Sequence, residues 1–101
     1  MAEELYTSGR WTVKPGHEDE FIAAWSEFAE WSRTNSPGAS WALLLRDRQQ
    51  SNVFTSLGPW ESAMAVEAWR ASDGFRTRIG RIRGLLDGFE AATLDPVARV
   101  E

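Results

Sequence analysis

The chain of 101 residues has no cysteine and a single histidine, His17. Without cysteine it can form no disulfide, no thiolate nucleophile and no zinc or iron–sulfur site with cysteine ligands. One histidine also excludes a metal site built from several histidines of the same chain. No glycine-rich phosphate-binding motif is present. We therefore expect no metal, no haem, no flavin and no other cofactor.

Long apolar runs and an excess of positive charge are also missing. No run approaches the roughly 18 apolar residues needed to cross a bilayer, and Met1-Ala2-Glu3-Glu4 is acidic where a signal peptide is basic. Fifteen acidic and eleven basic residues give a net charge of −4, whereas nucleic-acid-binding domains usually carry a basic excess. We expect one cytoplasmic domain over residues 1–101 that binds neither nucleic acid nor membrane.

Tryptophan and arginine are distributed unusually. The chain has six tryptophans, where about one or two are usual for this length. Five of its eleven basic residues fall within fourteen positions, namely Arg70, Arg76, Arg78, Arg81 and Arg83. This run is interpreted either as a solvated helix face, or as the wall of an anion-attracting pocket or a subunit contact.

Apolar periodicity predicts seven short elements. Alternation over 5–13 indicates a half-buried strand, and the stripe of Phe21, Trp25, Phe28 and Ser32 indicates a helix over 16–34. Strands are also predicted over 40–46, 53–57 and 89–94, and helices over 60–71 and from Phe75 to a stop at Gly88. The apolar stripe of the last helix is Phe75, Ile79, Ile82 and Leu86.

This order of elements is that of a ferredoxin-like α+β domain, a split β-α-β arrangement with helices on one face of a four-stranded antiparallel sheet. The strand over 40–46 is apolar on both faces, with Trp41, Leu43 and Leu45 on one and Ala42 and Leu44 on the other. One helical layer cannot cover both faces, so we expect a homodimer held by the uncovered sheet faces. The alternative is a monomer whose helices and loops cover every apolar residue.

The chain contains several short motifs. In order along the sequence they are Val13-Lys14-Pro15-Gly16, Pro37-Gly38 before a strand, Trp60-Glu61-Ser62, and then Trp69 and Phe75. In the order and spacing of these motifs, the sequence resembles the antibiotic biosynthesis monooxygenase family over about residues 7–95. The resemblance implies a dimeric α/β barrel of two ferredoxin-like units, each with a cavity between sheet and helices. Family members include cofactor-independent oxygenases of phenolic polycycles, haem-degrading enzymes and many proteins without known activity.

The sequence departs from this family at polar positions. The anthrone-oxidising branch has an asparagine four residues before the tryptophan at 60 and a tyrosine six after it, where this chain has Ser56 and Val66. The haem-degrading branch needs an asparagine on the first strand, which is absent, and an axial histidine where Ile79 stands. We therefore do not expect haem degradation. Quinone formation fits the fold and the aromatic residues but not the family's polar catalytic set.

Oxidation without a cofactor requires the substrate to supply the electrons. A phenol or anthrone loses a proton, and its carbanion passes an electron to oxygen in a dry pocket. Aromatic side chains can wall such a pocket for a small aromatic ligand, and an arginine can stabilise the phenolate. The candidate walls are Trp60, Trp69, Trp41, Trp25 and Phe54, and the candidate catalytic residues, which would stabilise the anion, are Arg78 and Arg81.

Competing interpretations apply to the same residues. Trp25 lies within an apolar stripe and is better explained as core, Trp60 is equally a structural anchor, and His17 at a helix start lacks any motif of a general base. The leading function is a cofactor-independent monooxygenase. The alternatives are a non-catalytic small-molecule-binding or structural dimer, and an isomerase or cyclase that uses Tyr6 or an arginine.

Overall fold

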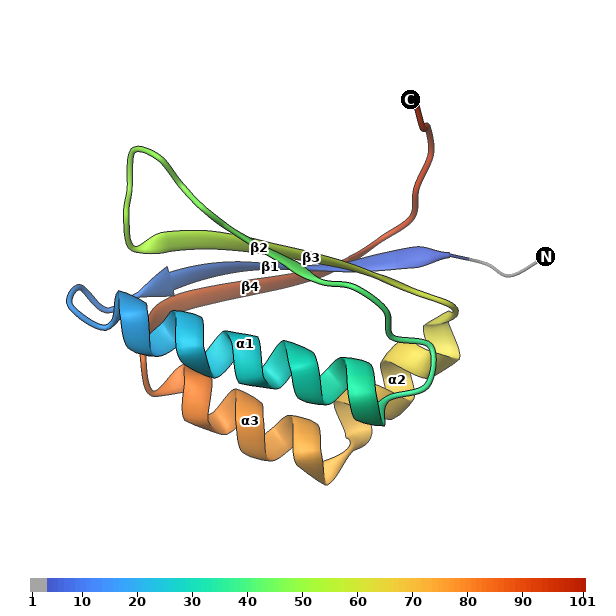
Figure 1. Cartoon of the computed structure of the whole chain (residues 1–101), viewed down its shortest axis with the longest axis horizontal. Helices are drawn as coiled ribbons and strands as arrows, with labels where there is room; N and C mark the ends of the chain where they lie inside the picture. The colour runs from blue at the N-terminus through green and yellow to red at the C-terminus, as the bar shows by residue number, and fades with distance from the viewer. Residues whose placement is uncertain (1–3) are drawn as a thin grey trace.

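The structure, a computed structural model, describes residues 4–101. These residues form four strands and three helices in the order β1 (Leu5–Val13), α1 (Glu18–Asn35), β2 (Leu43–Arg46), β3 (Val53–Trp60), α2 (Ala63–Ala71), α3 (Asp73–Arg83) and β4 (Leu86–Leu94). The strands pair antiparallel in the order β2-β3-β1-β4. Figure 1 shows all three helices on one side of this sheet. The predicted ferredoxin-like α+β fold is confirmed.

The central strand β1 alternates between two faces as its sequence predicts. Leu5, Gly9, Trp11 and Val13 are buried on the face toward the helices, because successive side chains of a strand point to opposite sides. The partner residue of Trp11 is Phe54 on β3 and Phe89 on β4. Aromatic rings from three strands thus meet at this end of the sheet.

Helix α1 covers the sheet with the predicted stripe. It begins two residues later than expected, after Gly16, whose φ of +94° is accessible to glycine at little cost. Acidic residues occupy the first turn, where their negative charges interact favourably with the positive end of the helix dipole. The helix ends at Asn35, one residue beyond the predicted end, before a turn at Gly38 with φ +92°.

The sequence-based boundaries were wrong around Trp60 and Leu86. Strand β3 continues through Gly58-Pro59, and Trp60 ends this strand instead of opening α2. Proline is tolerated there because β2 pairs with β3 only as far as Leu57. Helix α3 ends at Arg83, so Leu86 lies not on the helix but on β4, opposite Val13. The pairing of β4 with β1 outweighs the continued helical spacing of apolar residues.

Serine side chains define the starts of the two later helices. Ser62 accepts a hydrogen bond from the backbone N–H of Ala65 at 3.1 Å and so caps α2. Ser72 accepts from the N–H of Phe75 at 3.2 Å and caps α3. Such a cap stabilises a helix by about 1 kcal/mol, and the change of direction at Ser72 separates α2 from α3.

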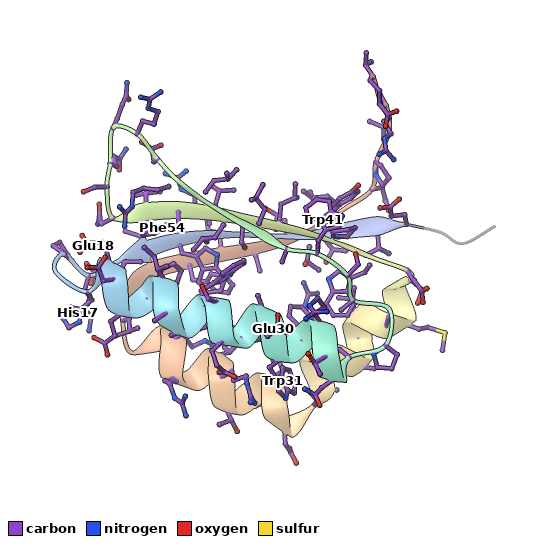
Figure 2. The ribbon with its side chains drawn as sticks, in the orientation of Figure 1. His17, Glu18, Glu30, Trp31, Trp41 and Phe54 are labelled. Atoms are coloured by element: carbon purple, nitrogen blue, oxygen red, sulfur yellow. The ribbon has the colours of Figure 1, made fainter. Side chains whose placement is uncertain are left out.

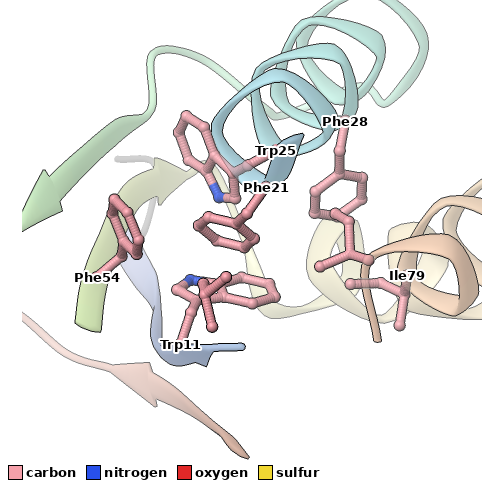
Figure 3. Packing of buried hydrophobic residues seen from close by; sticks show 8 residues of the cluster. Trp11, Phe21, Trp25, Phe28, Phe54 and Ile79 are labelled. Atoms are coloured by element: carbon pink, nitrogen blue, oxygen red, sulfur yellow. The ribbon is translucent and has the colours of Figure 1, made fainter. Parts of the chain in front are cut away.

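The main core lies between α1, α3 and the sheet (Figure 3). Phe21 is at its centre, with ring centroids 5.5 Å from Trp11 and 5.0 Å from Phe54. The members of this cluster are Trp11, Val13, Phe21, Trp25, Phe28, Phe54, Ile79 and Ile82. A smaller cluster of Leu5, Trp60 and Val66 lies under α2.

The sheet face away from the helices carries apolar side chains in contact with solvent. Trp41 is 53% exposed, Leu43 46% and Leu45 50%, while Leu44, on the other face, packs against the main core. Tyr6 meets Trp41 edge to face at 6.4 Å. The predicted two-sided apolar pattern is confirmed, although β2 begins only at Leu43. Within residues 4–101, no helix is long and apolar enough to cross a membrane.

Candidate functional site

A cavity of about 120 Å³ lies between the sheet and the helical layer. Side chains fill most of the space between these layers (Figure 2), and the cavity is what remains near the ends of α1 and α2. Its apolar aromatic lining residues are Trp11, Trp25, Phe28, Trp60, Trp69, Phe75 and Phe89. An apolar, partly enclosed cavity of this kind favours a flat, apolar ligand.

The sheet supplies a floor of small residues. On β1 and β3, Thr7 is opposite Gly58 and Gly9 is opposite Ser56, and all four line the cavity. Larger pairs bound this floor, because Leu5 faces Trp60 at one end and Trp11 faces Phe54 at the other. The cavity exists here because the residues between the two tryptophans are too small to fill it.

Each tryptophan that walls the cavity from the sheet or from α2 donates its indole N–H to a hydroxyl group. The three pairs are Trp11 with Ser56 at 3.0 Å, Trp60 with Thr7 at 3.1 Å, and Trp69 with Ser32 at 2.9 Å. Because the polar edge of each ring is satisfied, its apolar face is available for packing. These bonds join segments 37 or more residues apart in sequence.

Trp69 is the centre of the aromatic wall. Its ring is 4.7 Å from Trp60 and 4.7 Å from Phe75, and it stacks on Phe28 at 5.6 Å with the planes 19° apart. Ser32, which accepts its N–H, also donates to the carbonyl of Phe28 at 2.8 Å. The orientation of Trp69 is therefore held by one hydrogen bond and three ring contacts.

Gly9 is required by the position of Trp11. A Cβ atom at Gly9 would lie 2.7 Å from the indole Nε1 of Trp11 and 3.0 Å from the hydroxyl of Ser56. The indole ring of Trp11 therefore packs directly against the backbone of Gly9, and its N–H donates to the hydroxyl of Ser56. Any side chain at this position would push the indole out of its hydrogen bond.

Two arginine side chains carry the charge among the lining residues that the structure describes. Among the residues of 4–101 that line it, Arg33 and Arg70 are the only ones with titratable side chains, and both are exposed. Arg33 is paired with Glu30, and this hydrogen-bonded carboxylate raises the pKa of the guanidinium group. No carboxylate of the described residues pairs with Arg70. The solvent side of the cavity is thus positive, and Arg70 is the better placed to meet an anion.

The five candidate wall residues lie at different places relative to the cavity. Trp60 and Trp69 line the cavity. Trp41 also borders it, but its ring packs against Tyr6 on the far side of the sheet. Phe54 is 2% exposed, lies in the core against Phe21 and is not a lining residue. Trp25 is core, as expected, and also reaches the cavity.

The structure does not bring Arg78 or Arg81 to the cavity. Arg78 donates to Glu27 at 3.0 Å and to the carbonyl of Gly74 at 3.2 Å, with its guanidinium 4.3 Å from the ring centre of Trp31. It joins α1 to α3 because Ile79 and Ile82 face the core and turn Arg78 toward α1. Arg81 is exposed.

His17 also lies away from the cavity. It precedes α1, beside the loop that follows β1 (Figure 2), and contacts Glu20 at 3.2 Å. The sequence reasoning missed the hydroxyl groups and Arg33. Only Ser32 left a signal, because it is a polar residue within the apolar stripe of α1 and proves to be buried, with 6% exposure.

The sequence matches the family described as antibiotic biosynthesis monooxygenase over residues 5–79. The chain belongs to this family. Among solved structures, SnoaB from Streptomyces nogalater, a cofactor-independent oxygenase, is 26% identical to this family member. The alignment covers 99% of this chain and 97% of SnoaB, with a TM-score of 0.85 for a mutant form and 0.84 for a second SnoaB structure.

A second structure has a similar fold. It is a putative antibiotic biosynthesis monooxygenase from Caulobacter crescentus, 20% identical, with a TM-score of 0.86 over 96% of this chain and 92% of that one. No curated protein matches the sequence.

Two of the positions at which this family member departs from the anthrone-oxidising branch can be placed. Ser56 lies on the cavity floor, where it accepts the N–H of Trp11. Val66 is buried in the small cluster with Leu5 and Trp60 and is not a lining residue. The polar set at the site therefore consists of hydroxyl groups on the floor and guanidinium groups at the solvent side.

Proposed function

We propose that this family member is a cofactor-independent monooxygenase that oxidises a planar phenolic, quinol or polycyclic aromatic substrate with O2. One observation carries the proposal: an apolar cavity walled by Trp60 and Trp69 has no charged lining side chains within residues 4–101 except Arg33 and Arg70. Such a cavity holds a flat ring in a dry environment and favours negative charge at its solvent side. These are the two conditions that the chemistry requires.

The reaction begins with loss of a proton from the bound substrate. The resulting carbanion gives one electron to O2, which yields a substrate radical and superoxide. Their recombination forms a peroxide, and loss of water leaves a new carbonyl group. One oxygen atom is incorporated into the product and the other leaves in water, so the substrate supplies all the electrons.

In this scheme Arg70, assisted by Arg33, stabilises the phenolate and its delocalised carbanion. This assignment replaces Arg78 and Arg81, which do not line the cavity. The residues of 4–101 that line the cavity include no carboxylate, histidine, lysine or tyrosine that could act as a general base. The proton therefore passes to water or hydroxide, and the role of the protein is to lower the pKa of the bound phenol.

The test is oxygen consumption by the purified protein with a hydroxyanthrone or a dihydroxynaphthalene, in the presence of a chelator and without added cofactor. Replacing Arg70 with glutamine should slow turnover roughly ten- to a hundredfold, as expected for the loss of a charge-assisted contact. Arg76→Gln is the matched control, since Arg76 is exposed on α3 and does not line the cavity. Equal rates in both variants would remove Arg70 from the mechanism.

The same proposal includes a homodimer formed through the uncovered sheet face. Trp41, Leu43 and Leu45 expose about half of their surface there, and a second copy of this face would cover them. The family resemblance supports this arrangement, since it implies a dimeric α/β barrel.

A second candidate is a non-catalytic ligand-binding or structural dimer. Ser56 and Val66 favour it, because the anthrone-oxidising branch has an asparagine and a tyrosine at these positions. Binding of an aromatic ligand without oxygen consumption for any such substrate would support it. An isomerase that uses Tyr6 has less support, because Tyr6 is not a lining residue of the cavity and packs against Trp41.

A further inference from the structure

The hydroxyl groups of Thr7 and Ser56 lie on the cavity floor with only part of their hydrogen-bonding capacity used. Each accepts one indole N–H, from Trp60 at 3.1 Å and from Trp11 at 3.0 Å. A hydroxyl group also has one proton to donate. Neither hydroxyl donates to an acceptor within residues 4–101, whereas Ser32 donates to the carbonyl of Phe28. Two O–H donors are thus left for whatever occupies the cavity.

The two hydroxyl groups occupy one face of the sheet at diagonal positions. Thr7 is opposite Gly58, and Ser56 is opposite Gly9 on the same pair of strands. Diagonal neighbours in an antiparallel pair are roughly 7 Å apart. Each hydroxyl therefore has a glycine across from it, and this spacing suits two oxygen atoms on opposite sides of one six-membered ring.

The tryptophans prepare these hydroxyl groups to donate. A hydroxyl that accepts a hydrogen bond becomes a better donor, and the effect is strongest where the surroundings are apolar. The indole N–H also occupies one side of each oxygen and thereby restricts the direction of its O–H bond. A ligand without acceptor atoms would displace water from these groups and leave them unpaired, which lowers its affinity.

We infer that Thr7 and Ser56 are specificity-determining residues that donate hydrogen bonds to two oxygen atoms across one ring of the ligand. The substrate class is accordingly a para-quinol or a fused-ring relative with two such oxygens, and the corresponding quinone should bind as well. This inference rests on the proposed function for the location of the site, but it concerns binding and not oxygen chemistry.

The experiment compares 1,4-naphthoquinone with naphthalene by titration calorimetry. The chain has no cysteine that the quinone could alkylate. The variants Ser56→Ala and Thr7→Val remove one hydroxyl each, and each should weaken binding of the quinone roughly three- to tenfold, the usual effect of one neutral hydrogen bond. Naphthalene binding should not weaken, because naphthalene has no acceptor for these donors and gains nothing from their presence.

Three further variants separate specificity from structural damage. Ser56→Thr and Thr7→Ser keep the hydroxyl group and should restore quinone affinity. Thr55→Val is the matched control, because Thr55 precedes Ser56 on β3 but is exposed and does not line the cavity. A structural role alone would weaken naphthalene and quinone binding to the same extent.

The inference is overturned by unchanged quinone affinity in both hydroxyl-free variants, by an equal loss for naphthalene, or by no quinone binding to the parent protein. Failure of the proposed function looks different. In that case quinone binding depends on Thr7 and Ser56 as expected, but no quinol supports oxygen consumption.

Discussion

Replacing Ser32 with alanine tests how far the cavity wall depends on one buried hydroxyl group. Ser32 accepts the N–H of Trp69 at 2.9 Å and donates to the carbonyl of Phe28 at 2.8 Å. Its removal leaves the indole N–H without a partner, which costs about 1–3 kcal/mol. Alanine regains up to about 0.5 kcal/mol through its higher helix propensity. We expect a net loss of about 0.5–2.5 kcal/mol in the free energy of unfolding.

In a domain of this size, a change of that magnitude lowers the melting temperature by roughly 2–20 °C. The assay is thermal denaturation followed by far-UV circular dichroism at one fixed protein concentration, since association also changes the apparent stability. The matched control is Ser26→Ala on the same helix. Ser26 donates to the carbonyl of Ile22 at 2.7 Å but is exposed and has no tryptophan partner. Its replacement should leave the melting temperature unchanged or slightly higher.

Equal melting temperatures for the Ser32→Ala and Ser26→Ala proteins would refute this reasoning. That result would mean that Trp69 finds another acceptor or that its N–H reaches water. The cavity wall would then be held by ring packing alone.

Three other predictions concern different parts of the molecule. Arg78→Met should lower the free energy of unfolding in urea by about 1–2 kcal/mol, since it removes the contacts with Glu27 and Trp31. Oxygen consumption per folded molecule should stay the same, and a loss of turnover without a loss of stability would contradict this prediction. The parent protein should sediment as a dimer at micromolar concentration, and Leu43→Glu should give a folded monomer; a stable monomeric parent would refute the proposed interface. Turnover should rise with pH in a single step that follows the phenol pKa of each substrate. Arg70→Gln should move this step to higher pH by roughly one unit, because loss of the cation raises the pKa of the bound phenol. A step at the same pH for every substrate would instead indicate that a group of the protein acts as the base.

The periodicity of apolar residues was sufficient to predict which side of a single helix or strand is buried. The spacing of Phe21, Trp25, Phe28 and Ser32 predicted the buried side of α1, and alternation predicted that of β1. The two-sided apolar strand similarly predicted the uncovered sheet face. In each case burial of apolar surface on a regular element determines the outcome, and the period of that element is visible in the sequence.

Other features depend on tertiary pairing, which the sequence does not display. Gly58-Pro59 resembles a strand terminator, but β2 pairs with β3 only as far as Leu57, so the proline interrupts no pairing with β2 and Trp60 remains on β3. Leu86 continues a helical spacing, yet its pairing with Val13 makes it a strand residue. Tertiary contacts outweigh local propensity at both positions.

The choice among the arginines could not be predicted for a related reason. Arg70 and Arg78 belong to one basic run, but only Arg70 lines the cavity. Which of them reaches it depends on the break between α2 and α3 at Ser72 and on the rotation that buries Ile79. The hydroxyl partners of the tryptophans were equally hidden, since Trp69 and Ser32 are 37 residues apart.

The closeness of Trp60 and Trp69 has an optical consequence. Their ring centroids are 4.7 Å apart with planes inclined by 43°, so the electronic transitions of the two indoles should couple. Such a pair gives a paired positive and negative band in circular dichroism, which is lost when either ring turns or is replaced. Because both rings line the cavity, a ligand that enters should change this signal in the unlabelled protein. The cavity wall thus contains its own spectroscopic reporter.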